Sequence, residues 1–377
     1  MKYALITDTH FGARNDSLIF ANFFRRFYEE IFFPTLVERK VDGVIHLGDI
    51  VDRRKFINYK TLNTMREIFL GPLNELKIPT SIIIGNHDIY FKNTLEVNAV
   101  RELMDGYDYL SYYEEPSVVK LGNTEVLILP WICEDNHEKS MSMLEKSRCP
   151  VVFGHLHLDG IEHTKGSIST DGFSPSLFKA YRKVFSGHFH HRSITGNIHY
   201  LGNPYEMTWA DYNDQRGFHI FDTETLDTEF IPNPFSMFHK IYYDDSEGQE
   251  PEQDLTRYKD CYVKIIIKNK TNQYMFEALM DGLIKVGVGN ISIIDNLFDI
   301  EDLGEDLESI EDVEDTMSVI KNCVDSLQIT NKGELNKLMQ DLYNEALTVE
   351  TVRIDNIEEC KKEKKKRKTE FQNKSLR

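Results

Sequence analysis

The chain has 377 residues, of which 41% are hydrophobic and 28% charged, an ordinary composition for a globular protein with a sizeable core. This length suits one large domain together with one or two small ones. The formal net charge of −18 argues against a protein that simply coats nucleic acid. It does not exclude a nucleic-acid enzyme, because a local metal cluster can supply the positive charge.

The cysteine pattern and the apolar runs limit where the protein works. The five cysteines are scattered, odd in number and never form a CxxC pair, which predicts free thiols rather than a disulfide framework or a zinc knuckle. Residues 1–6 read as a strand and not as a signal peptide, and no run approaches the ~20 apolar residues that span a bilayer. We therefore expect an intracellular, cytoplasmic protein with no membrane partner.

The first 88 residues alternate between strand-like and helix-like patterns. Strands are predicted at 3–7, 41–47 and 79–84, where short apolar runs end in polar residues. Helices are predicted between them at 17–39 and 56–70, the first broken or restarted by Pro34. This alternation predicts a layered α/β core.

Beyond residue 90 the pattern becomes rich in strands, as in a two-sheet sandwich. One further helix is predicted at 94–104. The strands expected here are two about the turn Gly122-Asn123 within 118–130, and then 151–153, 183–186, 197–201 and 217–222.

The composition changes after Pro232-Asn233-Pro234, which suggests a small β-α-β appendage. Strands are predicted at 238–243, 261–268 and 290–294, with a helix at 272–286. Residues 295–315 then hold eleven acids and no base, and residues 361–368 hold seven bases and one acid. We expect a core domain at 1–235, a capping and DNA-binding domain at 236–296, an acidic linker at 297–330, an amphipathic helical segment at 331–358 and a basic tail at 359–377.

Metal-competent side chains follow five of the apolar runs. Each stretch alone is explained as well by ordinary polar residues at a strand end, but five together favour a metal site, because hard divalent ions accept carboxylate, amide oxygen and imidazole. Seven such groups suit two ions ~3.5–4 Å apart. The predicted metal ligands are Asp8, His10, Asp49, Asn86, His155, His188 and His190.

The set of motifs resembles the calcineurin-like metallophosphoesterase superfamily. The motifs are Asp8-x-His10, Gly48-Asp49-x-x-Asp52-Arg53, Gly85-Asn86-His87-Asp88, Gly154-His155 and Gly187-His188-x-His190. The longer layout is similar to SbcD-type DNA-repair nuclease subunits, and to the tailed-phage recombination endonuclease subunits among them. The resemblance implies a two-sheet metallophosphoesterase core flanked by helices. It also implies a dimetal DNA exonuclease and endonuclease that uses two Mn²⁺ or Mg²⁺ ions.

The resemblance also assigns roles to individual residues. One metal would be held by Asp8, His10, Asp49 and His190, and the other by Asp49, Asn86, His155 and His188. His87 would be the unmetallated group that protonates the leaving alkoxide, a task that suits imidazole near neutral pH.

The sequence departs from the nuclease pattern at one position. Asp52 stands where these nucleases commonly carry a second histidine, which weakly favours a phosphatase; alternatively the Asp52 carboxylate orients His87. Asp88 is expected to orient its neighbours. His46, His157 and His191 are interpreted as bystanders.

DNA and protein partners are predicted from charge and from apolar faces. Arg14, Arg53, Arg54 and Lys55 are candidate phosphate contacts near the metals. The helices at 56–69 and 94–104 offer homodimer surfaces, although core packing explains their apolar faces equally well. The resemblance names an SMC-like ATPase as the partner of 331–358, with folding back on the chain's own domain as the alternative.

Two other functions stay open at this point. A stand-alone metallophosphatase or small-nucleotide phosphodiesterase would use the same core without needing the appendage or the C-terminal helix. A scaffold with a vestigial site is disfavoured because no predicted ligand position is missing. The absence of a GxxxxGK[ST] sequence argues against a nucleotide-driven motor within this chain.

Overall fold

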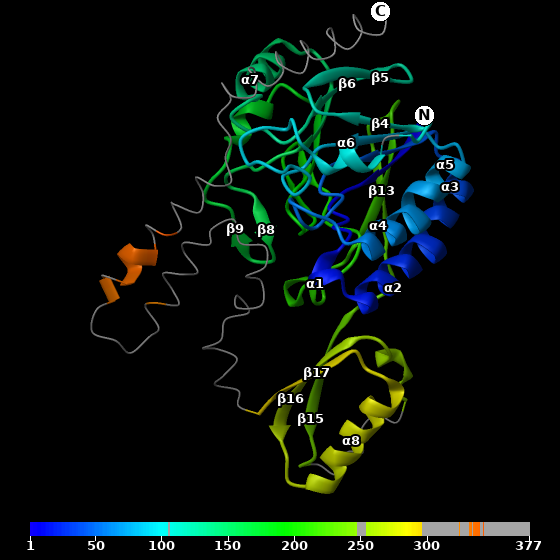
Figure 1. Cartoon of the computed structure of the whole chain (residues 1–377), viewed down its shortest axis with the longest axis vertical. Coiled ribbons are helices and arrows are strands. Elements are labelled where there is room, and N and C mark those ends of the chain that lie inside the picture. The colour runs from blue at the N-terminus through cyan, green and yellow to red at the C-terminus, as the bar shows by residue number, and fades with distance from the viewer. Residues whose placement is uncertain are drawn as a thin grey trace, which may run out of the picture.

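Two six-stranded sheets form the core of the computed structural model, which describes residues 1–104, 106–246, 254–295, 324, 332–333, 335–339 and 342. The sheets lie face to face and helices cover their outer faces (Figure 1). The two-sheet α/β architecture predicted for the core is therefore confirmed. The acidic linker, most of the helical segment and the basic tail lie outside the described residues.

The first sheet has the order β14-β13-β1-β2-β3-β4. Strands β1 to β4 run parallel, and they are joined in part by the predicted helices, as in a βαβ unit. The strands are β1 (Lys2–Ile6), β2 (Gly43–His46), β3 (Thr80–Ile83), β4 (Leu110–Tyr113), β13 (Gly217–Asp222) and β14 (Thr228–Pro232).

The second sheet has the order β11-β12-β10-β7-β6-β5. Its four central strands are parallel, and antiparallel neighbours lie at both edges. The strands are β5 (Ser117–Leu121), β6 (Thr124–Leu129), β7 (Val151–His155), β10 (Lys183–Gly187), β11 (Ser193–Thr195) and β12 (Ile198–Tyr200), with the separate hairpin β8 (Glu162–Thr164) and β9 (Ser167–Ile168).

The space between the sheets is filled by side chains from both. Leu5, Ile45 and Ile83 of the first sheet share one buried cluster with Phe153 and Phe185 of the second. The central strands are buried on both faces, which explains why they read as nearly continuous apolar runs without alternation. Because β1, β2, β3, β7 and β10 are parallel within their sheets, the polar residues that follow them gather at one edge of the sandwich.

Helices on the first sheet pack through an aromatic cluster that includes Phe20, Phe27, Tyr28 and Phe69. The predicted helix at 17–39 runs on through a π-helical turn, and Pro34 restarts its last part. The helical elements here are α1 (Ala13–Asp16), α2 (Leu18–Phe27), η1 (Tyr28–Phe32), α3 (Phe33–Arg39), α4 (Tyr59–Met65), η2 (Arg66–Leu70) and α5 (Gly71–Glu75).

Three expectations for the helices need correction. The apolar face predicted for 56–69 does not include Tyr59, which is 90% exposed, whereas Met65 and Phe69 are in the core. The helix expected at 94–104 is only α6 (Ala99–Met104), because Asn98 pairs with Ile89 and the preceding chain is a loop. A helix over the second sheet, α7 (His137–Lys146), was not predicted.

The appendage is a three-stranded parallel sheet covered on one face by a helix. Its buried cluster includes Val263, Ile265 and Leu283. The appendage lies at the bottom of Figure 1, below the core. Phe20 and Trp209 of the core pack against Phe238 at the joint. The elements are β15 (Phe238–Asp244), η5 (Thr256–Tyr258), β16 (Tyr262–Asn269), α8 (Gln273–Val286) and β17 (Asn290–Ile294).

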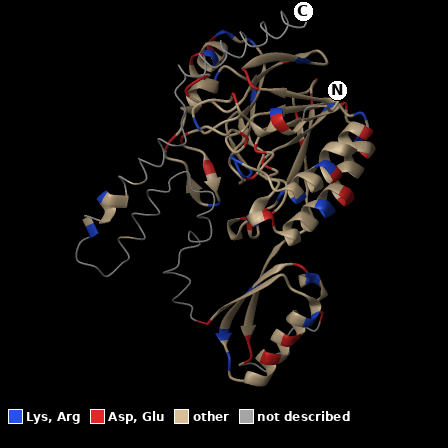
Figure 2. Cartoon of the chain, viewed as in Figure 1, with Lys and Arg blue, Asp and Glu red and all other residues tan. Residues whose placement is uncertain are grey.

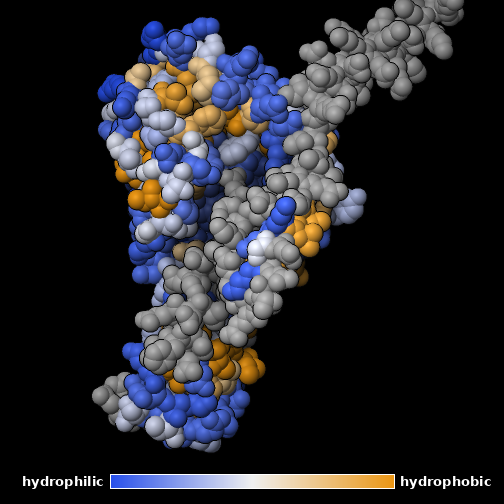
Figure 3. Space-filling view, turned by 90° about the vertical axis from the view of Figure 1, so that its left-hand side faces the viewer, coloured by the Kyte–Doolittle hydropathy of each residue, from blue (hydrophilic) through white to orange (hydrophobic). Residues whose placement is uncertain are grey.

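The part of the surface that the structure describes mixes charged, polar and apolar residues. Basic and acidic residues are interspersed along the helices of the core and along α8 (Figure 2). On the face shown in Figure 3, hydrophobic residues gather in small groups among hydrophilic ones. Cys133, Cys149 and Cys261, the cysteines within the described residues, are buried and unpaired, as predicted. Within the same residues, no helix has the length and apolar composition needed to cross a membrane.

Candidate metal centre

The loops after the central strands are held together by their main chains. Asp8 donates its N–H to the carbonyl of Gly48, and His10 donates to that of Asp49, at 3.0 and 3.1 Å. Asp8, His10, Asp49 and His188 all have positive φ angles, between 40° and 88°. Such left-handed conformations cost energy in non-glycine residues and are typical of functional sites.

Two glycines allow the sheets to approach at this edge. A Cβ atom on Gly187 would lie 2.0 Å from the Thr7 hydroxyl oxygen, and one on Gly48 would lie 2.5 Å from Nδ1 of His155. Real Cβ atoms do not come so close to other atoms, so any side chain at either position would push the loops apart. The glycines of the motifs therefore serve the geometry of the site.

The candidate ligands form two groups, each with one aspartate and two histidines. The first group is Asp8, His10 and His190, and the second group is Asp49, His155 and His188. In each group the ligand atoms all lie within 4.8 Å of one another. The structure thus brings together six of the seven predicted ligands, from strand ends far apart in the sequence.

The seventh predicted ligand, Asn86, lies in the second group. Its Oδ1 atom is 2.9 Å from Nε2 of His155 and 3.0 Å from Nδ1 of His188. Nδ1 of His155 is 2.7 Å from the carbonyl oxygen of Leu47 and must carry a proton to donate to it. In the neutral ring, the lone pair of the other nitrogen is directed at Oδ1 of Asn86 and at Oδ2 of Asp49, which lies 3.2 Å away.

The acceptor atoms that converge on Nε2 of His155 would be stabilised by a cation between them. Burial disfavours a charged His155, but Asp49 and Asp8 outweigh burial and raise the pKa of His155 to about 9. A proton can satisfy the acceptors, and a divalent metal can do so for all of them at once. The second group therefore fits a metal ion by the chemistry of its donors.

The first group fits a metal for a different reason. Nε2 of His10 and Nε2 of His190 face each other at 3.1 Å, while Nδ1 of His10 is buried without a hydrogen-bond partner. Burial, followed by the neighbouring His87 and His190, holds the pKa of His10 well below its usual range. Neutral imidazole is the form that binds metals, so these two rings suit a shared ion beside the Asp8 carboxylate.

Asp49 lies between the two groups. Its Oδ2 atom is 3.2 Å from Nε2 of His155 and 3.9 Å from Nε2 of His10. Its Oδ1 atom accepts the main-chain N–H of His87 at 2.8 Å. Burial opposes the ionised form, but the histidines outweigh burial and hold the pKa of Asp49 well below its usual range. A charged carboxylate in this position can serve both groups.

Asp88 joins two of the site loops without lying in either metal group. Its carboxylate accepts main-chain N–H groups from Asp49, Ile50, Val51 and Gly85 at 2.8 to 3.3 Å. Burial, helped by the nearby charge of Asp49, raises the pKa of Asp88 to about 6. The contacts are those of a residue that orients Asp49 and the loop bearing Asn86.

His87 lies half-buried beside the first group, with its ring 4.8 Å from that of His10 and nearly at right angles to it. Its Nδ1 atom lies 2.7 Å from the main-chain carbonyl oxygen of Asp52. Asp52 therefore contacts His87 through its main chain. The Asp52 carboxylate lies 3.7 Å from Nδ1 of His10, and its predicted role in orienting His87 stays a prediction.

The four predicted DNA contacts lie in α1 and in the chain that follows β2. Arg53 donates to Asp16 at 2.6 Å and to Asn15 at 3.1 Å, so a phosphate contact by Arg53 would have to break an ion pair. Nε of Arg54 donates to the carbonyl of Ile89. Arg14 is half-buried and Lys55 is exposed.

The histidines interpreted as bystanders have distinct places. His46 is buried and lies 3.0 Å from the Thr9 hydroxyl, and His191 lies 2.7 Å from Asp214. His157 pairs with Asp171 at 3.0 Å, and its ring lies 4.9 Å from that of His188. His157 is therefore beside the second group, which the sequence interpretation did not anticipate.

A buried network supporting the first group was also missed. Arg216 donates to the main-chain carbonyl of His190 and to the side chain of Asn203, and it pairs with Asp211 and Asp214 at 2.8 Å. Its side chain is only 4% exposed. The only signal in the sequence was two acids and an arginine within six residues, which is common on surfaces.

The family of the chain follows from the match of its first half. Residues 1–192 match the model of the calcineurin-like phosphoesterases. The chain belongs to the calcineurin-like phosphoesterase family, as its motifs predicted.

Two proteins of known function are similar in sequence to the chain. The chain is 31% identical to exonuclease subunit 1 of Enterobacteria phage T4 over 350 residues, covering 92% of this chain and 99% of that protein. It is 27% identical to the DNA double-strand break repair protein Mre11 of Sulfurisphaera tokodaii over 198 residues, covering 50% of this chain and 49% of that protein. The first match includes the appendage, so the likeness is not confined to the catalytic core.

Proposed function

We propose that the protein is a dimetal DNA nuclease, with both exonuclease and endonuclease activity, that acts in recombination and double-strand-break repair. The observation that carries this proposal is the pair of three-residue groups joined by Asp49, set in a chain similar over nearly its full length to a phage exonuclease subunit. Two Mn²⁺ or Mg²⁺ ions, when bound, would stabilise charge on the phosphate oxygens and activate water.

The residues of the chain have separate tasks in this proposal. Asp8, His10, His190 and Asp49 would hold one ion, and Asp49, Asn86, His155 and His188 would hold the other. His87 stands beside His10 of the first group, and its task is to protonate the leaving oxygen of the substrate. The main-chain carbonyl of Asp52, 2.7 Å from Nδ1 of His87, orients the ring.

The test is Mn²⁺-dependent cleavage of a labelled DNA oligonucleotide, measured beside hydrolysis of a generic phosphodiester. We expect both substrates to be cleaved by the full chain. Cleavage of the generic substrate alone, with none of DNA even when the partner ATPase is added, would instead establish a stand-alone phosphatase or small-nucleotide phosphodiesterase.

An SMC-like ATPase is the proposed partner of the segment 331–358. The described residues of this segment are helical, and Leu338 and Leu342, one turn apart, are 54% and 51% exposed. Leucines at this spacing suit a helix that docks into an apolar groove. Co-purification with the ATPase should be abolished by Leu338→Glu and unaffected by Lys337→Glu.

We also propose a homodimer that uses the outer surface near 56–69. Met65 and Phe69 are buried in the core, but Phe56 and Tyr59, near the start of α4, are 64% and 90% exposed. Sedimentation of the Tyr59→Asp variant should show a monomer where the parent chain sediments as a dimer. A variant that sediments like its parent would place the dimer contact elsewhere, for instance at 94–104.

A further inference from the structure

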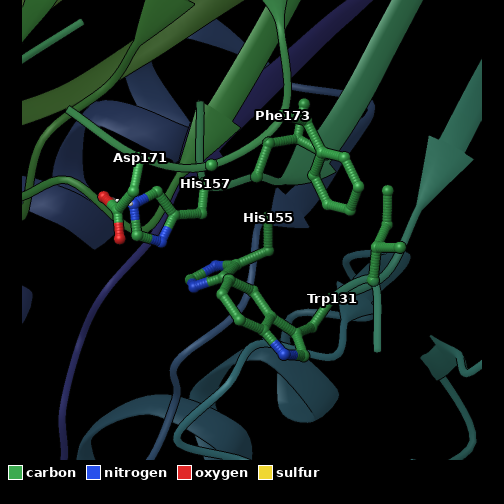
Figure 4. A pocket seen from close by; sticks show the side chains of 8 residues that line it. Trp131, His155, His157, Asp171 and Phe173 are labelled. Carbon is green, nitrogen blue, oxygen red and sulfur yellow. Dashed lines mark hydrogen bonds and ion pairs between the residues drawn. The ribbon is translucent and has the colours of Figure 1, made fainter. Parts of the chain in front are cut away.

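A cavity of about 300 Å³ opens directly beside the second group. His155 belongs to both, because it lines the cavity and also supplies a ligand atom to the group. Figure 4 shows His157 with Asp171 on one side of the cavity, Trp131 and Phe173 on the other, and His155 between them. A ligand held at the second group therefore has an aromatic cavity as its immediate neighbour.

The distances between the cavity walls and His188 suit a substrate that spans the second group and the cavity. The indole of Trp131 lies 5.1 Å from the ring of His188, and the ring of His157 lies 4.9 Å from the same histidine. A phosphate bound at the second group would have its next chemical unit within this cavity. For a nucleic acid that unit is a nucleoside, with its flat base.

The walls of the cavity are built into the fold. Phe173 pairs with Leu158 in a β-bridge, and its N–H donates to the carbonyl of His157 at 2.9 Å. Gly172 has a φ of +105°, and a Cβ there would lie 2.6 Å from the same carbonyl oxygen, so a larger residue would move this wall. On the other side, the main-chain N–H of Trp131 donates to the carbonyl of Ile84, the residue that follows β3.

The lining favours one class of ligand. Trp131 and Phe173 present flat apolar surfaces, whereas the His157–Asp171 pair puts polar groups at one side. Nucleobases have flat faces that stack on aromatic rings and polar edges that accept and donate hydrogen bonds. An aliphatic chain would make no polar contact with the His157–Asp171 pair, whereas the polar edge of a nucleobase can, which favours a base over a lipid or an apolar peptide.

We propose that this cavity is a nucleobase subsite, which stacks the base next to the scissile phosphate on Trp131. The inference rests on the proposed nuclease function and names the form of DNA that the site takes. A base inside the cavity cannot remain stacked in a duplex, so the preferred substrate is unpaired: single-stranded DNA or a frayed end.

The first test measures binding without turnover. In a Trp209→Phe background, Trp131 is the only tryptophan of the chain. With Mn²⁺ present, dAMP should quench its fluorescence with saturation, whereas deoxyribose 5-phosphate, which has no base, should not. Equal responses to the two compounds, or none to dAMP, would overturn the subsite whether or not the protein cleaves DNA.

The second test uses single-stranded oligonucleotides with one abasic residue placed at successive positions. In the parent chain, cleavage at the phosphate next to the abasic residue should fall about tenfold, as expected for the loss of one stacked base. Trp131→Ala should slow cleavage of intact DNA by a similar factor, and the abasic residue should then cause no further loss. Trp131→Phe should keep the abasic effect, because it keeps a stacking ring.

The outcomes separate the two proposals. An abasic effect that is equally large in Trp131→Ala would overturn the base subsite and leave the nuclease proposal standing. Failure of the parent chain to cleave any DNA would overturn the nuclease proposal, and the dAMP titration would still decide the subsite. Calorimetric Mn²⁺ binding by Trp131→Ala should match that of the parent, which shows that the metal groups have not been disturbed.

Discussion

The first and second groups have the same composition, one aspartate and two histidines, but the protein orients them by different means. In the second group the Leu47 carbonyl fixes the protonation of His155, and buried carboxylates raise its pKa to about 9. In the first group Nδ1 of His10 has no hydrogen bond, the Asp52 carboxylate lies 3.7 Å from it, and burial holds the pKa of His10 low. The second group is thus ordered by its own hydrogen bonds, whereas the first depends on surrounding residues such as Arg216.

The largest expected effect comes from Asp49, which lies between the groups. Asp49→Ala should weaken metal binding at both and lower nuclease activity by about 10³-fold or more, because metal stabilisation of the transition state is worth several kcal/mol. Mn²⁺ titration calorimetry and DNA cleavage measure the two effects. Asp42→Ala, an exposed carboxylate before β2, is the matched control. Two intact binding events in Asp49→Ala would show that the groups are independent of it.

His87 should separate metal binding from turnover. His87→Ala is expected to keep both metals and to lose about 10²–10⁴-fold in turnover, the usual contribution of a general acid. The main-chain N–H that donates to Asp49 survives the substitution, which is why metal binding should be retained. The exposed His137→Ala is its control. Loss of a bound metal in His87→Ala would reveal a ligand role and contradict this assignment.

Arg216 should affect the first group alone. Arg216→Lys keeps the charge but cannot donate to Asp211, Asp214 and the His190 carbonyl together, so Mn²⁺ affinity there should fall about 10–100-fold. A two-site calorimetric titration can resolve the effect, with Arg192→Lys as the control. Equal weakening of both sites would mean that Arg216 supports the fold as a whole and not His190 in particular.

The smallest effect concerns Glu206, in the same chain segment as the Arg216 network. Its carboxylate accepts the N–H groups of Met237 and Phe238 at the joint with the appendage, and burial raises its pKa from 4.5 to about 7. The folded state then binds the proton more tightly than the unfolded chain does. Its contribution to stability is therefore complete below about pH 4.5 and is lost as the pH rises through about 7.

Glu206→Gln should remove this pH dependence, which is worth on the order of 2 kcal/mol in the free energy of unfolding. Chemical unfolding between pH 5 and 8 measures it, and Mn²⁺ affinity should be unchanged at either group. An unchanged pH profile of stability would show that Glu206 is ionised in the folded protein throughout this range.

Much of the site could be predicted because it consists of local patterns. Apolar runs that end in Asp8, Asp49 or His155 identify both the strand and the residue at its end, and five such runs in series define the family. Asp52 shows the limit of this method. Sequence reasoning can assign roles to side chains, but it did not foresee that the main-chain carbonyl of Asp52 contacts His87, because the direction of that carbonyl depends on the folded loop.

The sequence alone determined the fold class, the family motifs and the seven candidate ligands, because strand periodicity and the residues at strand ends are encoded within a few positions of each other. The family resemblance implied how the ligands divide into two groups. Only the tertiary structure decided that Arg216 supports His190 and that His157 lies beside His188 with Trp131 across a cavity. These pairings join residues far apart in the chain or on different loops. They depend on how two sheets pack, which no local pattern specifies.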